Sequence, residues 1–144
     1  MTDIKALCAE IEAAARMAGE FIKNESVVFD INDTETKGLN NFVTYVDKGS
    51  EKMLIEKLTP LIPEAGFIAE EGTSVKKGLK YNWIIDPLDG TTNFLHGVHP
   101  YAVSIGLMEN DEVIAGVVHE AGGDETFTAW KNGGAWLNGK RIHV

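Results

Sequence analysis

The chain has 144 residues, of which 44% are hydrophobic and 24% charged, values typical of one ordinary globular domain. This composition excludes an intrinsically disordered protein. The net charge of −9 argues against nucleic acid as a partner, because phosphate backbones attract surfaces rich in Lys and Arg. An acidic protein that binds phosphate would need a bound divalent cation, although the acidity by itself is better explained by solubility.

The first segment has the pattern of an amphipathic helix. Apolar residues recur at helical spacing from about residue 3 to 24, and Thr2 or Asp3 can cap the start. Acidic residues interrupt the apolar ones, which excludes a signal peptide or a membrane-spanning helix. The single cysteine, Cys8, falls on the apolar face and has no partner for a disulfide, so we expect a buried thiol in a cytoplasmic protein.

The middle of the chain alternates short elements. Residues 26–31 (SVVFDI) are expected to form a strand, residues 32–41 a loop, and residues 44–58 a second helix. Two short apolar runs follow, at 66–69 and 81–86, and both are typical of buried strands. Each run ends in acidic side chains, which places carboxylates at strand ends.

The last third of the chain is expected to be a β-meander. Strand patterns at 102–108, 113–119, 125–130 and 135–137 are separated by short turns rich in Gly, Asn and Asp. Consecutive strands joined by short turns pair antiparallel. The predicted fold class is therefore α+β, with two N-terminal helices packed on an antiparallel sheet of about six strands.

The segment from Asp86 to Thr91 (DPLDGT) concentrates the chemistry. Asp86 ends an apolar run, and Asp89 places a second carboxylate three residues later. Two carboxylates so close repel each other unless a cation lies between them, and oxygen ligands suit Mg²⁺ or Ca²⁺. Free N–H groups at Gly90 and Thr91 could bind an anion. The alternative interpretation is an ordinary turn, because the same residues favour turns.

A pair of glutamates, Glu70 and Glu71, follows the first of the two short apolar runs. If the two strands are neighbours, one of these carboxylates can reach the cation held by Asp86 and Asp89. The alternative for an adjacent Glu pair is a solvated surface. Three acids at strand ends around one point favour a magnesium site.

The Glu70-Glu71 pair followed by WIIDPLDGTTNFLHG resembles the signature of the inositol monophosphatase family. The resemblance extends to NFVTYVD, which contains Asp47, and to the strand-rich segment that ends at Val144. It implies the first lobe of an inositol monophosphatase-like fold, with residues 1–144 as a single N-terminal metal-binding lobe. The tryptophan-aspartate motif and the C-terminal lobe of the family are absent from this chain.

The resemblance also implies a role for each matching position. The implied metal ligands are the side chains of Glu70, Asp86 and Asp89 and the backbone carbonyl of Leu88, with Asp86 bridging two Mg²⁺ ions. The implied catalytic residues, which orient the attacking water, are Glu70, Thr91 and Asp47. The implied substrate-binding residues are Glu70, Leu88, Asp89, Gly90 and Thr91, with the N–H groups of the last two on the phosphate.

The function implied is Mg²⁺-dependent hydrolysis of inositol monophosphate, or a related polyol phosphate, to the alcohol and inorganic phosphate by a homodimeric enzyme. The partner would be a small phosphate monoester, without nucleic acid or membrane. Alternatives are a fructose-1,6-bisphosphatase or a 3',5'-bisphosphate nucleotidase. A non-catalytic metal-binding or dimerising fragment is a further alternative, because the isolated chain would lack part of the second metal site.

Four other side chains have two interpretations each. Lys37 resembles a loop lysine near the active site of the family, or is a solvated loop charge. His96 and His99 favour packing or surface roles over zinc binding, since the nearby acids prefer harder ions. Trp83 is expected in the core beside the site rather than as a stacking platform for a ligand.

Overall fold

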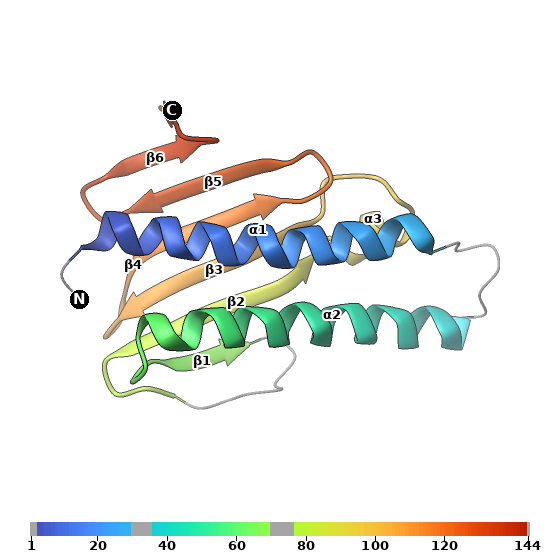
Figure 1. Cartoon of the computed structure of the whole chain (residues 1–144), viewed down its shortest axis with the longest axis horizontal. Helices are drawn as coiled ribbons and strands as arrows, with labels where there is room; N and C mark the ends of the chain where they lie inside the picture. Colours follow the sequence, from blue (N-terminus) through green and yellow to red (C-terminus); the bar gives the residue numbers. More distant parts are fainter. Residues whose placement is uncertain (1–2, 30–35, 70–76, 144) are drawn as a thin grey trace.

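The computed structural model describes residues 3–29, 36–69 and 77–143. Two long helices lie against one face of a seven-stranded sheet (Figure 1). In chain order the elements are α1 (Ile4–Val28), α2 (Thr36–Leu58), the 3-10 turn η2 (Thr59–Leu61), β1 (Gly66–Ala69), β2 (Tyr81–Asp89), α3 (Thr91–Leu95), β3 (Ala102–Glu109), β4 (Glu112–Glu120), β5 (Glu125–Trp130), β6 (Gly134–Leu137) and β7 (Lys140–Ile142).

Helix α1 confirms the expected amphipathic helix and extends beyond it. Asp3 caps it, its Oδ1 accepting a hydrogen bond from the Ala6 N–H at 3.1 Å. The helix continues to Val28, so the strand predicted from Ser26 is wrong over its described residues. Val27 and Val28 are each 78% exposed. β-branched residues favour strands when they pack against neighbouring strands, which these exposed valines do not. Adding a residue to an existing helix costs little, so the two valines continue α1.

Helix α2 begins at Thr36, earlier than the predicted Thr44, so Lys37 and its neighbours are helical where a loop was expected. Phe42 gives the reason. Its ring stacks on Phe29 with 4.2 Å between centroids and lies 5.9 Å from the Phe94 ring. This tertiary packing stabilises a turn of helix whose glycine and asparagines have low helical propensity. Helix α2 ends at Leu58, and Pro60 follows within η2, as expected.

The strands follow one another across the sheet in the order β1 to β7. The predicted α+β class and the meander are confirmed, with seven strands rather than about six. The first pair differs from the prediction, because β1 is parallel to β2, with Ala69 opposite Ile85. The carboxyl ends of β1 and β2 therefore lie at the same edge of the sheet.

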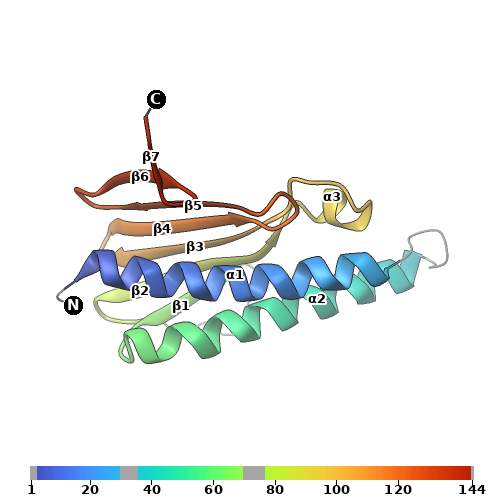
Figure 2. The same ribbon diagram turned by 45° about the horizontal axis from the view of Figure 1, so that its top comes forward.

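Helices α1 and α2 lie on the same side of the sheet, and the core lies between them and the sheet (Figure 2). Trp83 of β2 is fully buried there, as predicted. On the opposite face, which we call the open face, four apolar side chains are between 37% and 41% exposed: Ile68, Ile84, Val118 and Phe127. Within the described ranges, no helix has the length and apolarity needed to cross a membrane.

Candidate functional site

The acidic motif at the end of β2 is an interrupted strand rather than a free turn. Asp86 pairs with Ser104 and Asp89 with Ala102, so three steps along β2 match two steps along β3. This is a β-bulge, in which one strand carries an extra residue. Ser104 and Ala102 point to the same face because they are two residues apart. The bulge therefore places both carboxylates on one face of the sheet, where a regular strand would separate them.

The bulge has its own internal hydrogen bond. The Leu88 N–H donates to Oδ1 of Asp86 at 3.3 Å, which ties the carboxylate to the backbone two residues on. The Asp86 side chain is half-buried, whereas Asp89 is exposed at the strand end. One acid is thus held by the fold and the other is open to a ligand.

Gly90 joins the bulge to helix α3. Its φ is +86°, in the left-handed region, and a Cβ there would lie 2.9 Å from the carbonyl oxygen of Pro100. Glycine is needed for both reasons. Helix α3 begins at Thr91, and the Phe94 N–H donates to the Gly90 carbonyl at 2.9 Å. The N–H groups at the start of a helical turn have no partner within it, so they are available to an anion beside Asp89.

Helix α2 presents three buried polar residues to this end of β2. Asp47, Ser50 and Glu51 are only 6%, 0% and 1% exposed. The Ser50 hydroxyl donates to the Pro87 carbonyl at 2.8 Å, which joins α2 to the bulge. Since residues three and four apart share a helix face, Asp47 lies on the same side of α2 as this contact. The predicted catalytic Asp47 and the predicted ligands Asp86 and Asp89 are thus on elements in direct contact.

Glu51 is a polar residue that the sequence reasoning missed. Both of its carboxylate oxygens are buried and accept no hydrogen bond from the part of the chain that the structure describes. Helical spacing from Asp47 through Leu54 to Leu58 would have indicated that Glu51 faces inward. A buried carboxylate without a partner is costly unless a proton or a cation offsets it.

The donors near the bulge fit magnesium by their chemistry. Asp86 and Asp89 supply carboxylate oxygens, and hard oxygen ligands are what Mg²⁺ prefers. Among residues 3–29, 36–69 and 77–143, no three acidic, His or Cys side chains gather closely enough to hold a metal. Glu70, the third predicted ligand, and Glu71 lie outside the described residues, so their convergence with Asp86 stays a prediction.

Two other residue types have the roles expected from the sequence. His96 and His99 are exposed on the segment after α3, which agrees with a surface role. Cys8 is buried and its Sγ contacts the Ala129 carbonyl. Burial, with a smaller effect of Glu12, raises the pKa of the Cys8 thiol to about 11. A thiol with this pKa is protonated at neutral pH and is no nucleophile.

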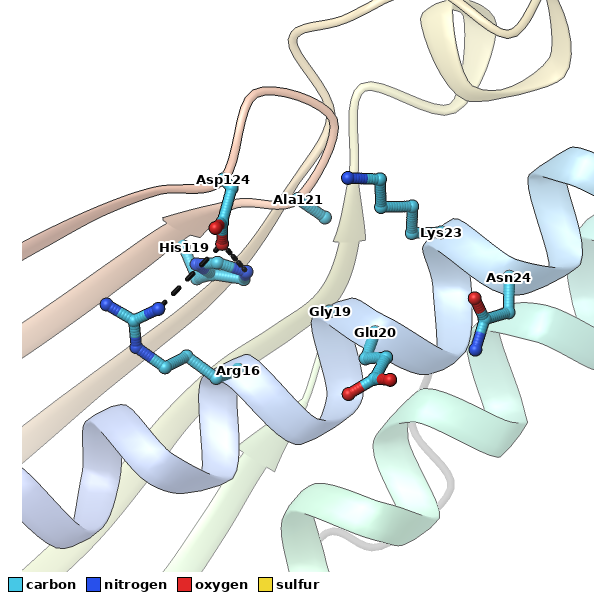
Figure 3. Close-up of a pocket in the computed structure, with 8 residues that line it drawn as sticks. All are labelled: Arg16, Gly19, Glu20, Lys23, Asn24, His119, Ala121 and Asp124. Carbon is cyan, nitrogen blue, oxygen red and sulfur yellow. Dashed lines mark ion pairs between the residues drawn. The ribbon is translucent and has the colours of Figure 1, made fainter.

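A cavity of about 480 Å³ lies between α1 and the β4–β5 turn (Figure 3). Arg16 Nη1 is 3.8 Å and His119 Nε2 is 4.0 Å from the same Oδ1 of Asp124. Arg16 and Lys23 are balanced by Glu20 and Asp124 around this cavity. Of the predicted site residues that the structure describes, none lines this cavity, and the charges around it offset one another.

The sequence profile of the inositol monophosphatase family matches residues 4–144. The fructose-1,6-bisphosphatase/inositol-1-monophosphatase of Aquifex aeolicus is 36% identical over 144 residues, which are 100% of this chain and 54% of that protein. The putative Nus factor SuhB of Neisseria meningitidis is 39% identical over 132 residues, covering 91% of this chain and 51% of that protein.

A solved structure, the extragenic suppressor protein suhB of Bartonella henselae, matches with a TM-score of 0.83 at 33% identity. The match covers 96% of this chain and 54% of that one. The chain thus spans about half the length of the relatives it matches. The profile match takes in α1, α2, the bulge and the whole sheet. The chain therefore belongs to the inositol monophosphatase family.

Proposed function

We propose that this chain is the metal-binding lobe of a Mg²⁺-dependent phosphatase, which hydrolyses inositol monophosphate or a related polyol phosphate to the alcohol and inorganic phosphate. The observation that carries the proposal is the bulge in β2, which places Asp86 and Asp89 on one face of the sheet. Membership of the inositol monophosphatase family supports a phosphoric monoester hydrolase.

In this proposal the side chains of Glu70, Asp86 and Asp89 and the Leu88 carbonyl hold the metal. Glu70 follows Ala69, which is opposite Ile85, the residue before Asp86. The parallel pairing of β1 and β2 supports a shared site at their carboxyl ends. Bound Mg²⁺ would lower the pKa of a water molecule and neutralise charge on the phosphate.

The residues around the metal would bind the phosphate and orient the water. The N–H groups of Gly90 and Thr91 stand at the start of α3, beside Asp89, where they can donate to phosphate oxygens. The Thr91 hydroxyl would orient the attacking water by a hydrogen bond, with help from the carboxylates of Asp47 and Glu70. Asp47 lies on the helix that contacts the bulge, which supports this role.

The substrate has two other candidates of the same reaction type. The Aquifex relative is named for both fructose 1,6-bisphosphate and inositol 1-phosphate hydrolysis, which supports a sugar or polyol phosphate. A nucleotide 3',5'-bisphosphate is the second candidate. Comparing hydrolysis of these phosphate esters distinguishes them.

A non-catalytic role is the candidate from a different class. It is favoured by the name of the Neisseria relative, a putative Nus factor. In this alternative the chain binds metal or dimerises without turnover. A phosphatase assay of the 144-residue chain beside a Mg²⁺ titration separates the two functions.

We also propose that residues 1–144 form a single N-terminal lobe, and that the open face of the sheet packs against the second lobe of the family. The exposed apolar side chains of this face, Ile84 and Phe127 among them, support such a contact. The complete enzyme would be a cytoplasmic homodimer. Sedimentation of the chain, alone and with a separately produced second lobe, tests the packing.

The central experiment is a Mg²⁺ titration of the chain by calorimetry, with Asp89→Asn as the variant. We expect the variant to bind Mg²⁺ well over ~10-fold more weakly, because losing a direct ligand costs more than losing an outer-shell partner. Asp111→Asn, in the β3–β4 turn, removes an equal charge far along the sheet and serves as the control. Equal Mg²⁺ affinity in Asp89→Asn and the control would remove Asp89 from the site.

A further inference from the structure

We propose that Ser50 is a positioning residue for the metal site, which acts through the Pro87–Leu88 peptide on the carboxylate of Asp86. The inference rests on the proposed function, since it concerns how the predicted ligands are held. Neither the DPLDGT motif nor Asp47 points to Ser50 in the sequence, because the contact joins residues 37 positions apart.

The first argument is that the bulge leaves the Pro87 carbonyl in need of a partner. Asp86 and Asp89 have register partners in β3, but the two residues between them have none. A buried carbonyl without a hydrogen bond is unfavourable. The Ser50 hydroxyl supplies that bond at 2.8 Å from a side chain that is 0% exposed. The contact therefore satisfies a carbonyl whose residue has no register partner in β3.

The second argument is that the same peptide group holds Asp86. The Pro87 carbonyl and the Leu88 N–H are the two ends of one planar peptide. Its oxygen accepts from Ser50 at 2.8 Å, and its N–H donates to Oδ1 of Asp86 at 3.3 Å. A rotation of the peptide would break both bonds together. Ser50 thus fixes the group that orients the Asp86 carboxylate.

The third argument concerns the direction of the Ser50 hydroxyl. A serine inside a helix often bonds to the carbonyl four residues earlier in the same helix. Thr59, the first residue of η2, does this towards α2, since its Oγ1 donates to the Ile55 carbonyl at 2.6 Å. Ser50 instead bonds to another element, three residues after Asp47. One helix thereby sets the distance between Asp47 and the bulge.

The test is a Mg²⁺ titration of the full 144-residue chain carrying Ser50→Ala. We expect Mg²⁺ to bind about 10-fold more weakly, as is typical when an outer-shell partner of a metal ligand is removed. Ser50→Cys keeps a side chain of similar size with a weak donor, so it should recover part of the affinity. Thr59→Ala removes an exposed hydroxyl-to-carbonyl bond just beyond the end of α2, away from the bulge, and should leave Mg²⁺ affinity unchanged.

The unfolding temperature of each variant is measured in the presence of a chelator. This measurement separates an effect on the stability of the fold from an effect on Mg²⁺ affinity, and so a structural role from a positioning role. A structural role alone would lower the unfolding temperature without changing the Mg²⁺ affinity of the folded chain. Wild-type Mg²⁺ affinity in folded Ser50→Ala, with weak binding in Asp89→Asn, overturns the Ser50 role and leaves the proposed function intact. If Ser50→Ala does not fold, Ser50→Cys is the deciding variant: weaker Mg²⁺ binding than the wild type and Thr59→Ala supports the role, and wild-type affinity overturns it. No Mg²⁺ binding by the wild-type chain overturns the proposed function as well.

Discussion

Gly19 of α1 lies directly against the imidazole of His119 on β4, so closely that a Cβ at this position would overlap the ring at Cδ2. The helix and the sheet can approach here because Gly19 has no side chain. We predict that Gly19→Ala destabilises the fold by about 1–3 kcal/mol, the usual cost of overpacking a filled contact. Urea unfolding measures this cost.

Gly106→Ala is the matched control for Gly19→Ala. A Cβ at Gly106 would make ordinary contacts at 3.8 Å with Ile84, on the open face of the sheet. We expect its effect on the free energy of unfolding to be small beside that of Gly19→Ala. Equal changes in the free energy of unfolding for the two substitutions would mean that Gly19 is not in tight contact with His119.

The same histidine gives a prediction about pH. Burial lowers the pKa of His119 below its ordinary value, with Arg16 acting in the same direction and Asp124, Glu120 and Glu12 opposing. The unfolded chain, with a His pKa of about 6.5, then binds the proton more readily than the folded chain. Stability from this group is present above about pH 6.5 and is lost as pH falls through the lowered pKa of the folded state.

We therefore expect urea unfolding at pH 7.5 and pH 5.5 to show a larger loss of stability at low pH in the wild type than in His119→Gln. The variant removes the titrating imidazole and keeps a polar group near Thr126, which contacts His119 Nδ1 at 2.8 Å. Titrating carboxylates contribute equally to both proteins and cancel. The same loss in both would exclude His119 as a source of the pH dependence.

Gly90 has a left-handed backbone conformation and also a close contact with Pro100. Comparing alanine substitutions at Gly90 and Gly97 separates the energetic cost of the backbone conformation from that of the contact. Gly97→Ala also places alanine at positive φ, +67°, but has nothing within 4 Å of the new Cβ. We predict that Gly97→Ala costs about 1 kcal/mol from the backbone alone, whereas Gly90→Ala costs more, because its Cβ meets the Pro100 carbonyl. Thermal unfolding measures both. Gly90→Ala should also weaken binding of inorganic phosphate, and unchanged phosphate binding would argue against α3 as the anion site.

Replacing the buried Glu51 is expected to increase the stability of the fold. Since its buried oxygens accept no hydrogen bond from the described residues, the charge is poorly compensated when no cation is present. We expect Glu51→Gln to raise the unfolding temperature in chelator by an amount equivalent to about 1 kcal/mol or more. Glu56→Gln, an exposed position on the same helix, should leave it unchanged. A lower unfolding temperature for Glu51→Gln would indicate that the carboxylate is stabilised by a bound group or proton.

The sequence predicted the features that depend on local pattern. The α1 stripe, the four-strand meander and the buried Trp83 all follow from periodicity and turn residues, and the structure has them. Two elements were wrong at their ends. Val27 and Val28 have the composition of a strand, and the start of α2 that of a loop. Neither composition reveals that Phe29 and Phe42 stack, which is a contact between distant segments.

The sequence singled out Asp86 and Asp89 of the candidate site but not the contacts that hold them. Asp86 and Asp89 stand out because two acids close together are unusual beside an apolar run. The extra residue in β2 depends on pairing with β3, and the Ser50–Pro87 bond depends on where α2 packs. Such contacts between separate elements leave no periodic signal in either segment.

The bulge also explains why the spacing of the two aspartates is an odd number. Side chains an odd number of positions apart in an uninterrupted strand lie on opposite faces of the sheet. A ligand bound on one face could then contact only one of the two carboxylates. In β2 the three steps from Asp86 to Asp89 match only two steps along β3, an even number, so both acids face the same way. Inserting or deleting one residue between Asp86 and Asp89 would therefore change the face of the sheet on which the second carboxylate lies, even though both acidic residues are kept.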